Sequence, residues 1–112
     1  MSRSKQKGTL AETAVAKYLS RLFPAVERRA PSGGYDKGDI AGVPGWVIEV
    51  KNHRSPSYRA WLREAEIERR NAGEQHGAVI SKPHGVGVDN VGQWHVVMTL
   101  DTYMSLLAAR TE

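Results

Sequence analysis

The stretch GDIAGVPGWVIEVK, residues 38–51, decides the fold of this 112-residue chain. Residues 39–43 and 46–51 both contain Val and Ile, which favour strands. Pro44 and Gly45 between them are turn residues, so the stretch predicts a β-hairpin. The hairpin is the element from which both the architecture and the candidate chemistry of the chain can be predicted.

The hairpin also carries the charged residues that suggest chemistry. Because side chains alternate along a strand, Glu49 and Lys51 share one face and Ile48 and Val50 point to the other. The turn brings Asp39 back toward Glu49. Two neighbouring carboxylates repel each other, and a hard cation such as Mg²⁺ relieves the repulsion. A lysine beside them can orient or deprotonate a metal-polarised water, so the set predicts metal-assisted phosphodiester hydrolysis.

The alternative for this cluster is an exposed polar sheet face, with Asp39 capping a turn. Glu-X-Lys alone does not distinguish the two interpretations. Gly38-Asp39-Ile40, ten residues before Glu49 and separated from it by a turn, favours the metal site.

The rest of the chain supplies further helices and strands. Helices are predicted at residues 9–23, 57–71 and 102–110, and strands at 26–29, 77–81 and 94–99. This order predicts a single α/β domain over residues 1–112, with a mixed central β-sheet flanked by helices. Residues 1–7 are predicted to be a flexible basic arm.

Glu12 is an anomaly in the first helix because it falls inside the apolar sector of the helical wheel. A carboxylate directed toward a core needs a partner. One interpretation pairs it with the Asp39, Glu49 and Lys51 cluster. The other makes Glu12 part of a capping box with Thr9.

Composition excludes several classes of protein. The chain has no cysteine, so disulfide frameworks, thiolate zinc sites and cysteine nucleophiles are ruled out. No apolar run reaches the roughly 18 residues that span a bilayer, and no signal peptide is recognisable, so a cytoplasmic protein without membrane contacts is expected. The formal net charge of +4 arises in the first 30 residues, which makes a polyanionic partner plausible.

The chain resembles the PD-(D/E)XK nuclease superfamily, and within it the archaeal-type Holliday junction resolvases. The resemblance covers residues 7 to about 53 and rests on these residues: Lys7-Gly8, Glu12, Arg28-Arg29, Ser32-Gly33, Gly38-Asp39-Ile40 and Ile48-Glu49-Val50-Lys51. It implies a restriction-endonuclease-like core and a Mg²⁺-dependent, structure-selective DNA endonuclease for recombination and repair.

The resemblance also implies roles for individual residues. Asp39 and Glu49 would bind Mg²⁺, with Mn²⁺ able to substitute, and Lys51 would serve the attacking water. Glu12 would support the metal or Lys51. Ser32 would lie in a mobile loop near the scissile phosphate.

The expected substrate is DNA, with four-way junctions favoured by the resemblance. The candidate DNA contacts are Lys5, Lys7, Arg28, Arg29 and Lys37. A junction has two symmetric scissile strands, so a homodimer with two identical sites is expected. Ile67, on the charged side of the second helix, is the predicted interface residue.

Two other functions stay open. The chain could be a nuclease acting on other DNA structures or on DNA ends. It could also be a non-catalytic DNA-binding module on the same fold, which would bind DNA without cutting it when Mg²⁺ is added.

Overall fold

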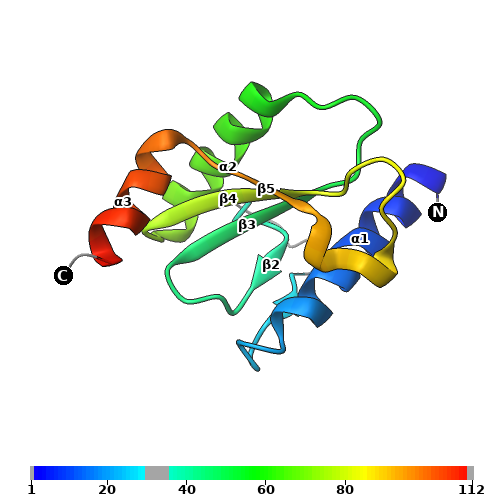
Figure 1. The fold of residues 1–112 in the computed structure, drawn as a ribbon, viewed down its shortest axis with the longest axis horizontal. Coiled ribbons are helices and arrows are strands. Elements are labelled where there is room, and N and C mark those ends of the chain that lie inside the picture. The colour runs from blue at the N-terminus through cyan, green and yellow to red at the C-terminus, as the bar shows by residue number, and fades with distance from the viewer. Residues whose placement is uncertain (1, 30–35, 111–112) are drawn as a thin grey trace.

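The computed structural model describes residues 2–29 and 36–110, which form an α/β fold (Figure 1). The elements are α1 (Arg3–Leu19), β1 (Glu27–Arg28), β2 (Ile40–Ala41), β3 (Trp46–Lys51), α2 (Tyr58–Ala72), β4 (His76–Ser81), the 3-10 helix η1 (Val88–Gln93), β5 (His95–Val97) and α3 (Leu100–Arg110). The predicted α/β class, with a mixed sheet and helices, is confirmed.

The five strands lie side by side in chain order, β1-β2-β3-β4-β5. β2 and β3 form the predicted antiparallel hairpin, in which Ile40 pairs with Ile48. β3 and β4 are parallel along their whole length, from Trp46 beside His76 to Lys51 beside Ser81. Because parallel strands end at the same edge, the segments that come after β3 and β4 emerge next to each other.

Helices α1 and α2 cover opposite faces of the sheet (Figure 1). The α1 face carries the larger core, which consists of Ala11, Val15, Ala16, Val26, Ile40, Ile48, Val50 and Trp94. On the α2 face, Trp61 and Ala65 pack against Val79 of β4. Ile48 and Val50 therefore face α1, as the strand alternation predicts, and Glu49 between them faces α2.

The N-terminal region differs from its predicted structure in four respects. Helix α1 begins at Arg3 rather than residue 9, because the Ser2 hydroxyl accepts a hydrogen bond from the Lys5 amide at 3.2 Å and caps the helix there. Residues 3–7 are therefore helical and not a flexible arm. Thr9 lies inside the helix, so it forms no capping box with Glu12. The helix also ends earlier than predicted, at Leu19.

Helix α2 agrees with its predicted bounds to within one residue. It ends at Gly73, whose left-handed backbone (φ 68°) lets its N–H bond back to the carbonyls of Arg69 and Arg70. Helix α3 starts at Leu100, two residues earlier than predicted. The Thr99 hydroxyl accepts a hydrogen bond from the Thr102 amide at 3.2 Å and caps this earlier start.

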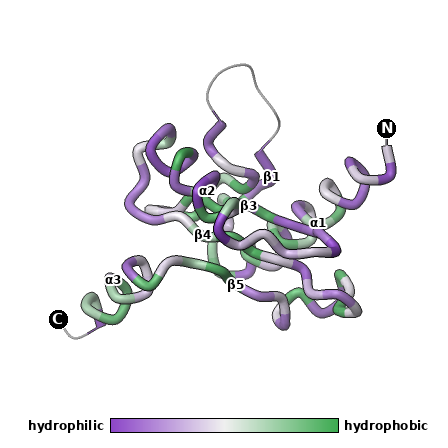
Figure 2. Tube along the Cα trace, turned by 90° about the horizontal axis from the view of Figure 1, so that it is seen from above, coloured by the Kyte–Doolittle hydropathy of each residue, from purple (hydrophilic) through white to green (hydrophobic). Residues whose placement is uncertain are grey.

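Helix α3 projects from the body of the molecule and none of its residues is buried (Figure 2). It lies at the end of the molecule opposite the N-terminus of α1 (Figure 1). Within the described part of the chain, no helix combines the length and the apolar character needed to cross a membrane.

Gly38 is required by the geometry at the start of the hairpin. Its φ is +96°, and a Cβ at this position would lie 2.8 Å from Cγ1 of Val47 and 3.2 Å from the Ile48 carbonyl oxygen. Its N–H donates to Oδ1 of Asp36 at 2.9 Å. Both the backbone conformation and the crowding therefore exclude a larger residue next to Asp39.

We expect Gly38→Ala to lower the free energy of unfolding by about 2 kcal/mol or more, because strain and overpacking add. Gly85→Ala is the matched control: Gly85 also has a positive φ, +80°, but nothing lies near its missing Cβ. It should cost only about 1 kcal/mol. Urea unfolding measures both, and equal losses would contradict the crowding argument.

Candidate metal and phosphodiester site

The hairpin brings Asp39 to the position opposite Glu49, one pair outward from Ile40 and Ile48. The Asp39 amide donates to the Ile48 carbonyl at 2.9 Å, and its own carbonyl accepts from the Arg29 amide at 2.7 Å. Its carboxylate oxygen Oδ2 accepts from the Val50 amide at 2.8 Å. Backbone hydrogen bonds on both sides thus fix Asp39 beside Glu49.

Glu49 lies under α2 and only 3% of its surface is exposed. The alternative of an exposed polar sheet face is therefore wrong for this residue. The helix was expected, but its position over this side chain was not. Glu49 Oε2 lies 3.5 Å from Nζ of Lys51, while Oε1 has no hydrogen-bond partner in the part of the chain that the structure describes. A buried carboxylate in this state requires a proton or a cation.

Helix α2 adds two more carboxylates to the same place. Glu64 and Glu68 are four residues apart and so share one face of the helix. Glu68 is 1% exposed, and neither of its carboxylate oxygens has a hydrogen-bond partner among the described residues. Glu64 is more exposed and bonds to Lys51.

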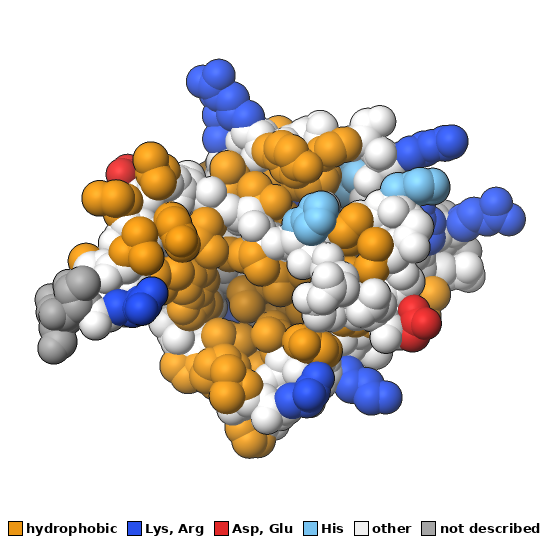
Figure 3. Space-filling view, in the orientation of Figure 1, with side chains coloured by type: hydrophobic (Ala, Val, Ile, Leu, Met, Phe, Trp, Pro, Cys, Tyr) orange, Lys and Arg blue, Asp and Glu red, His pale blue; other side chains and the backbone are white. Residues whose placement is uncertain are grey.

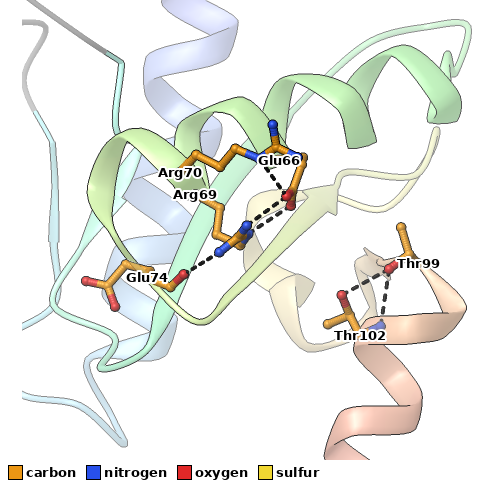
Figure 4. Close-up of polar contacts among 6 residues, drawn as sticks. All are labelled: Glu66, Arg69, Arg70, Glu74, Thr99 and Thr102. Atoms are coloured by element: carbon orange, nitrogen blue, oxygen red, sulfur yellow. Dashed lines mark hydrogen bonds and ion pairs between the residues drawn. The ribbon is translucent and has the colours of Figure 1, made fainter.

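Glu66, between these two residues, is engaged elsewhere. It accepts hydrogen bonds from Arg69 at 2.8 Å and from Arg70 at 3.2 Å, and Arg69 also donates to the Glu74 carbonyl (Figure 4). This network ties the end of α2 to the turn after it. Arginines therefore neutralise Glu66, whereas Glu64 and Glu68 remain available to the site.

Lys51 is the cation of the site. Its Nζ donates to Oε2 of Glu64 at 2.8 Å and lies 3.5 Å from Glu49. Burial alone would lower its pKa, but the hydrogen bond that Lys51 donates to Glu64 and the charge of Glu49 outweigh burial and raise the pKa of Lys51 above its ordinary value. Lys51 is therefore an ammonium at neutral pH, which can orient a water or hold an anion but cannot accept a proton.

Four carboxylates form what we call the carboxylate cluster: Asp36, Glu49, Glu64 and Glu68. Each contributes an oxygen, and these oxygens lie within 4.8 Å of one another. Asp36, Glu49 and Glu64 line a cavity of about 470 Å³ that Asp39 and Lys51 also line. One ammonium cannot neutralise this many carboxylates, so the cluster could hold a metal ion, and the unpartnered oxygens of Glu49 and Glu68 fit that role.

Three carboxylates of the site, Asp39, Glu49 and Glu68, resist ionisation. Burial is the largest cause, and it raises the pKa of Asp39 to about 6 even though the Val50 hydrogen bond opposes it. Burial also raises the pKa values of Glu49 and Glu68, whose carboxyl groups approach closely enough to share a proton. A site of this kind exchanges protons for a cation when one binds.

Glu12 forms neither the predicted capping box with Thr9 nor the predicted ion pair with Lys51. Its Oε1 accepts a hydrogen bond from Nε of Arg28 at 2.8 Å, so its ionic partner is Arg28 and not Lys51. It still lines the cavity that Asp39 and Glu49 line, and its charge contributes to the raised pKa of Asp39. The position of Glu12 in the apolar sector of the helical wheel is therefore explained by its partner Arg28 on β1.

The other residues predicted to contact DNA lie in surroundings that differ from one another. Lys7 lines the cavity, while Lys5 and Lys37 are exposed. Arg29 is half-buried, and its Nε has no hydrogen-bond partner among residues 2–29 and 36–110. Ser32 lies outside the described residues.

Asp36, Glu64 and Glu68 were not predicted from the sequence. A signal for the helical pair was present: Trp61, Glu64, Ala65 and Glu68 have the i, i+3, i+4, i+7 spacing of one helix face. Two acidic residues on the face that buries Trp61 and Ala65 are as anomalous as Glu12 is in α1. No comparable pattern marks Asp36.

Stability should depend on pH and on metal. Asp39, Glu49 and Glu68 have raised pKa values in the folded state, so between about pH 4 and their folded values the folded protein binds more protons than the unfolded chain. Without metal, stability should therefore fall by about 1–3 kcal/mol as pH rises from 5 to 8. Mn²⁺ or Mg²⁺ should restore it, mainly at pH 8.

Thermal unfolding in EDTA and in Mn²⁺ across this pH range measures the effect. Glu68→Gln removes one buried charge and should flatten the pH dependence. Glu66→Gln is the control, because Glu66 lies on the outer face of α2 and its arginine partners lower its pKa. A melting temperature at pH 8 that does not respond to either metal would contradict the metal site.

Comparisons of the chain with protein-family models, with curated proteins and with solved structures find no match.

Proposed function

We propose that this protein is a Mg²⁺-dependent DNA endonuclease. The observation that carries the proposal is the convergence of Asp39, Glu49 and Lys51 at one cavity, with a buried Glu49 oxygen that lacks a partner. The resemblance to PD-(D/E)XK nucleases assigns metal and water chemistry to the same three residues. Geometry and resemblance thus support the same assignment independently.

Oxygen ligands and a compact group of carboxylates suit Mg²⁺, with Mn²⁺ as a substitute. Asp39 and Glu49 would hold the ion from the hairpin, and Asp36 and Glu64 reach the same cavity. When bound, the ion polarises the phosphodiester and lowers the pKa of a bound water. Glu68 does not line the cavity, but its carboxylate oxygen lies within 4.8 Å of those of Asp36, Glu49 and Glu64 and would add its charge to the metal site.

Lys51 acts in this proposal as a donor. Glu64 holds its ammonium at 2.8 Å, which fixes the side chain in the cavity without neutralising the whole site. From there Lys51 orients the attacking water or a phosphate oxygen. Glu64 is therefore a positioning residue as well as a candidate ligand.

Four-way junctions are the substrate suggested by the resemblance, and cutting them symmetrically needs two sites. A second copy of this chain would supply the other site. Ile67, the predicted interface residue, is exposed but lies among Arg63, Glu66 and Arg70. The described surface offers a larger group of exposed apolar side chains elsewhere. We therefore propose that the interface lies on α3 and β5.

This α3 patch consists of Val96, Leu100, Tyr103, Met104 and Leu107, which are 38–72% exposed. Figure 3 shows apolar side chains gathered over this side of the molecule. Together these five expose about 500 Å² of apolar surface. A standard interface buries about 800 Å² per partner, of which roughly 65% is apolar in homodimers, so the patch has the area that a dimer needs.

Asp39→Asn and Glu49→Gln should each abolish cleavage while DNA binding is retained or strengthened, because each removes a metal ligand and a charge that repels phosphate. The assay is cleavage of labelled four-way, flap and linear duplex DNA in Mg²⁺ or EDTA. Glu66→Gln should cut like the wild type. Near wild-type cleavage by either site variant refutes the metal assignment, and binding without cleavage by the wild type would identify a non-catalytic module.

Met104→Asp should convert the dimer to a monomer, because it introduces a charge at the centre of the apolar patch. Ile67→Asp places the same charge at an equally exposed but isolated position and should leave the dimer intact. Sedimentation at micromolar concentration measures both variants. If Ile67→Asp alone abolishes the dimer, the interface lies on α2 and not on α3. If the wild type is a monomer, the dimer is refuted.

A further inference from the structure

A second cavity adjoins the carboxylate site and has the opposite charge. It has a volume of about 290 Å³ and is lined by Lys7, Asn52, His53, Arg54, Lys82 and His84. No acidic residue of the described ranges lines it. Four of these residues, Lys7 and 52–54, also line the carboxylate cavity, so the two cavities form one continuous groove.

The topology of the sheet creates this cationic cavity. Residues 52–54 come after β3 and residues 82–84 after β4, and because these strands are parallel, both segments emerge at the same edge. The Lys82 amide donates to the Lys51 carbonyl at 2.9 Å, which holds the two segments together. Lys7 reaches the cavity from α1 on the other face of the sheet. Three separate elements therefore converge on one point.

The cations of this cavity are not neutralised within the described part of the chain. Lys7, Arg54 and Lys82 form none of the ion pairs found there, whereas Arg28, Lys51, Arg69 and Arg70 are all paired with glutamates. In Figure 3, His side chains and some of the Lys and Arg side chains lie on the side of the molecule away from α3, while other Lys and Arg side chains stand elsewhere on its outline. An unpaired cluster of cations and imidazoles suits a phosphate group.

We propose that this cavity binds a backbone phosphate of the nucleic acid strand whose scissile phosphate occupies the carboxylate site. The inference rests on the proposed function, and it names contacts that the resemblance does not supply, with Arg54 and Lys82 as the principal ones. The groove then alternates in charge along the strand. Carboxylates that can hold a cation lie at the point of cleavage, and fixed cations lie at a neighbouring phosphate.

Phosphate contacts are independent of base sequence and depend strongly on salt. Binding to this cavity should therefore fix the register of the strand without selecting a sequence. Because Lys7, Arg54 and Lys82 come from three elements, the cavity also requires the assembled fold, so its contribution is distinct from nonspecific attraction by the basic N-terminal region.

The test is binding of a labelled duplex of about 20 base pairs in EDTA, where cleavage cannot occur, at several salt concentrations. Lys82→Gln and Arg54→Gln should each weaken binding several-fold and lower the slope of log affinity against log salt by about one. The matched control is Lys17→Gln, at the far end of the helix that carries Lys7. It removes the same charge and should leave the slope unchanged. Circular dichroism of each variant verifies folding, and Lys82→Arg should restore the slope.

The outcomes separate this proposal from the nuclease itself. Unchanged slopes in both test variants overturn the phosphate cavity, whatever the cleavage assays give. Reduced slopes support it even if Asp39→Asn still cuts DNA, a result that would refute only the metal assignment. Tight binding of inorganic phosphate at unchanged slopes would assign the cavity to a small anion and overturn the backbone contact.

Discussion

The burial of Glu49 beneath α2 is the constraint on which the rest of the site depends. A carboxylate at the centre of a sheet, covered by a helix, is tolerated only with a compensating charge or proton. The fold supplies one ammonium, from Lys51. It also places Glu68 against Glu49, which increases the negative charge around Glu49. Such an arrangement has no advantage for stability alone, because replacing it with apolar side chains would strengthen the core. Functional sites commonly retain a loss of stability of this kind.

The surrounding features hold this unfavourable group in one geometry. Gly38 allows β2 to approach β3 so closely that the Asp39 carboxylate reaches the Val50 amide. The network of Glu66 with Arg69 and Arg70 secures the end of the helix that carries Glu64 and Glu68. The site is thus built mainly on a hairpin and one helix, with rigid elements on either side.

Local patterns predicted the hairpin, α2 and the approach of Asp39 to Glu49, because turn residues and strand alternation act over a few positions. The first residues of α1 and α3 were harder to predict, because a single hydroxyl group, that of Ser2 or of Thr99, decides where each helix begins. The partner of Glu12 could not be predicted from spacing, because Arg28 reaches it across the tertiary fold. Glu64 and Glu68 were visible as charges on an apolar face, but their contact with Glu49 depends on how α2 crosses the sheet.

Helix α3 differs from α1 and α2 in that it buries none of its side chains. Its 11 residues are too few for a helix to be stable alone in water. With no side chain in either core, it gains little from the cooperativity that holds the sheet together. The folding of α3 is therefore coupled to binding. A neighbouring surface that bound this helix would also complete its folding, and part of the binding free energy would be spent on ordering the helix.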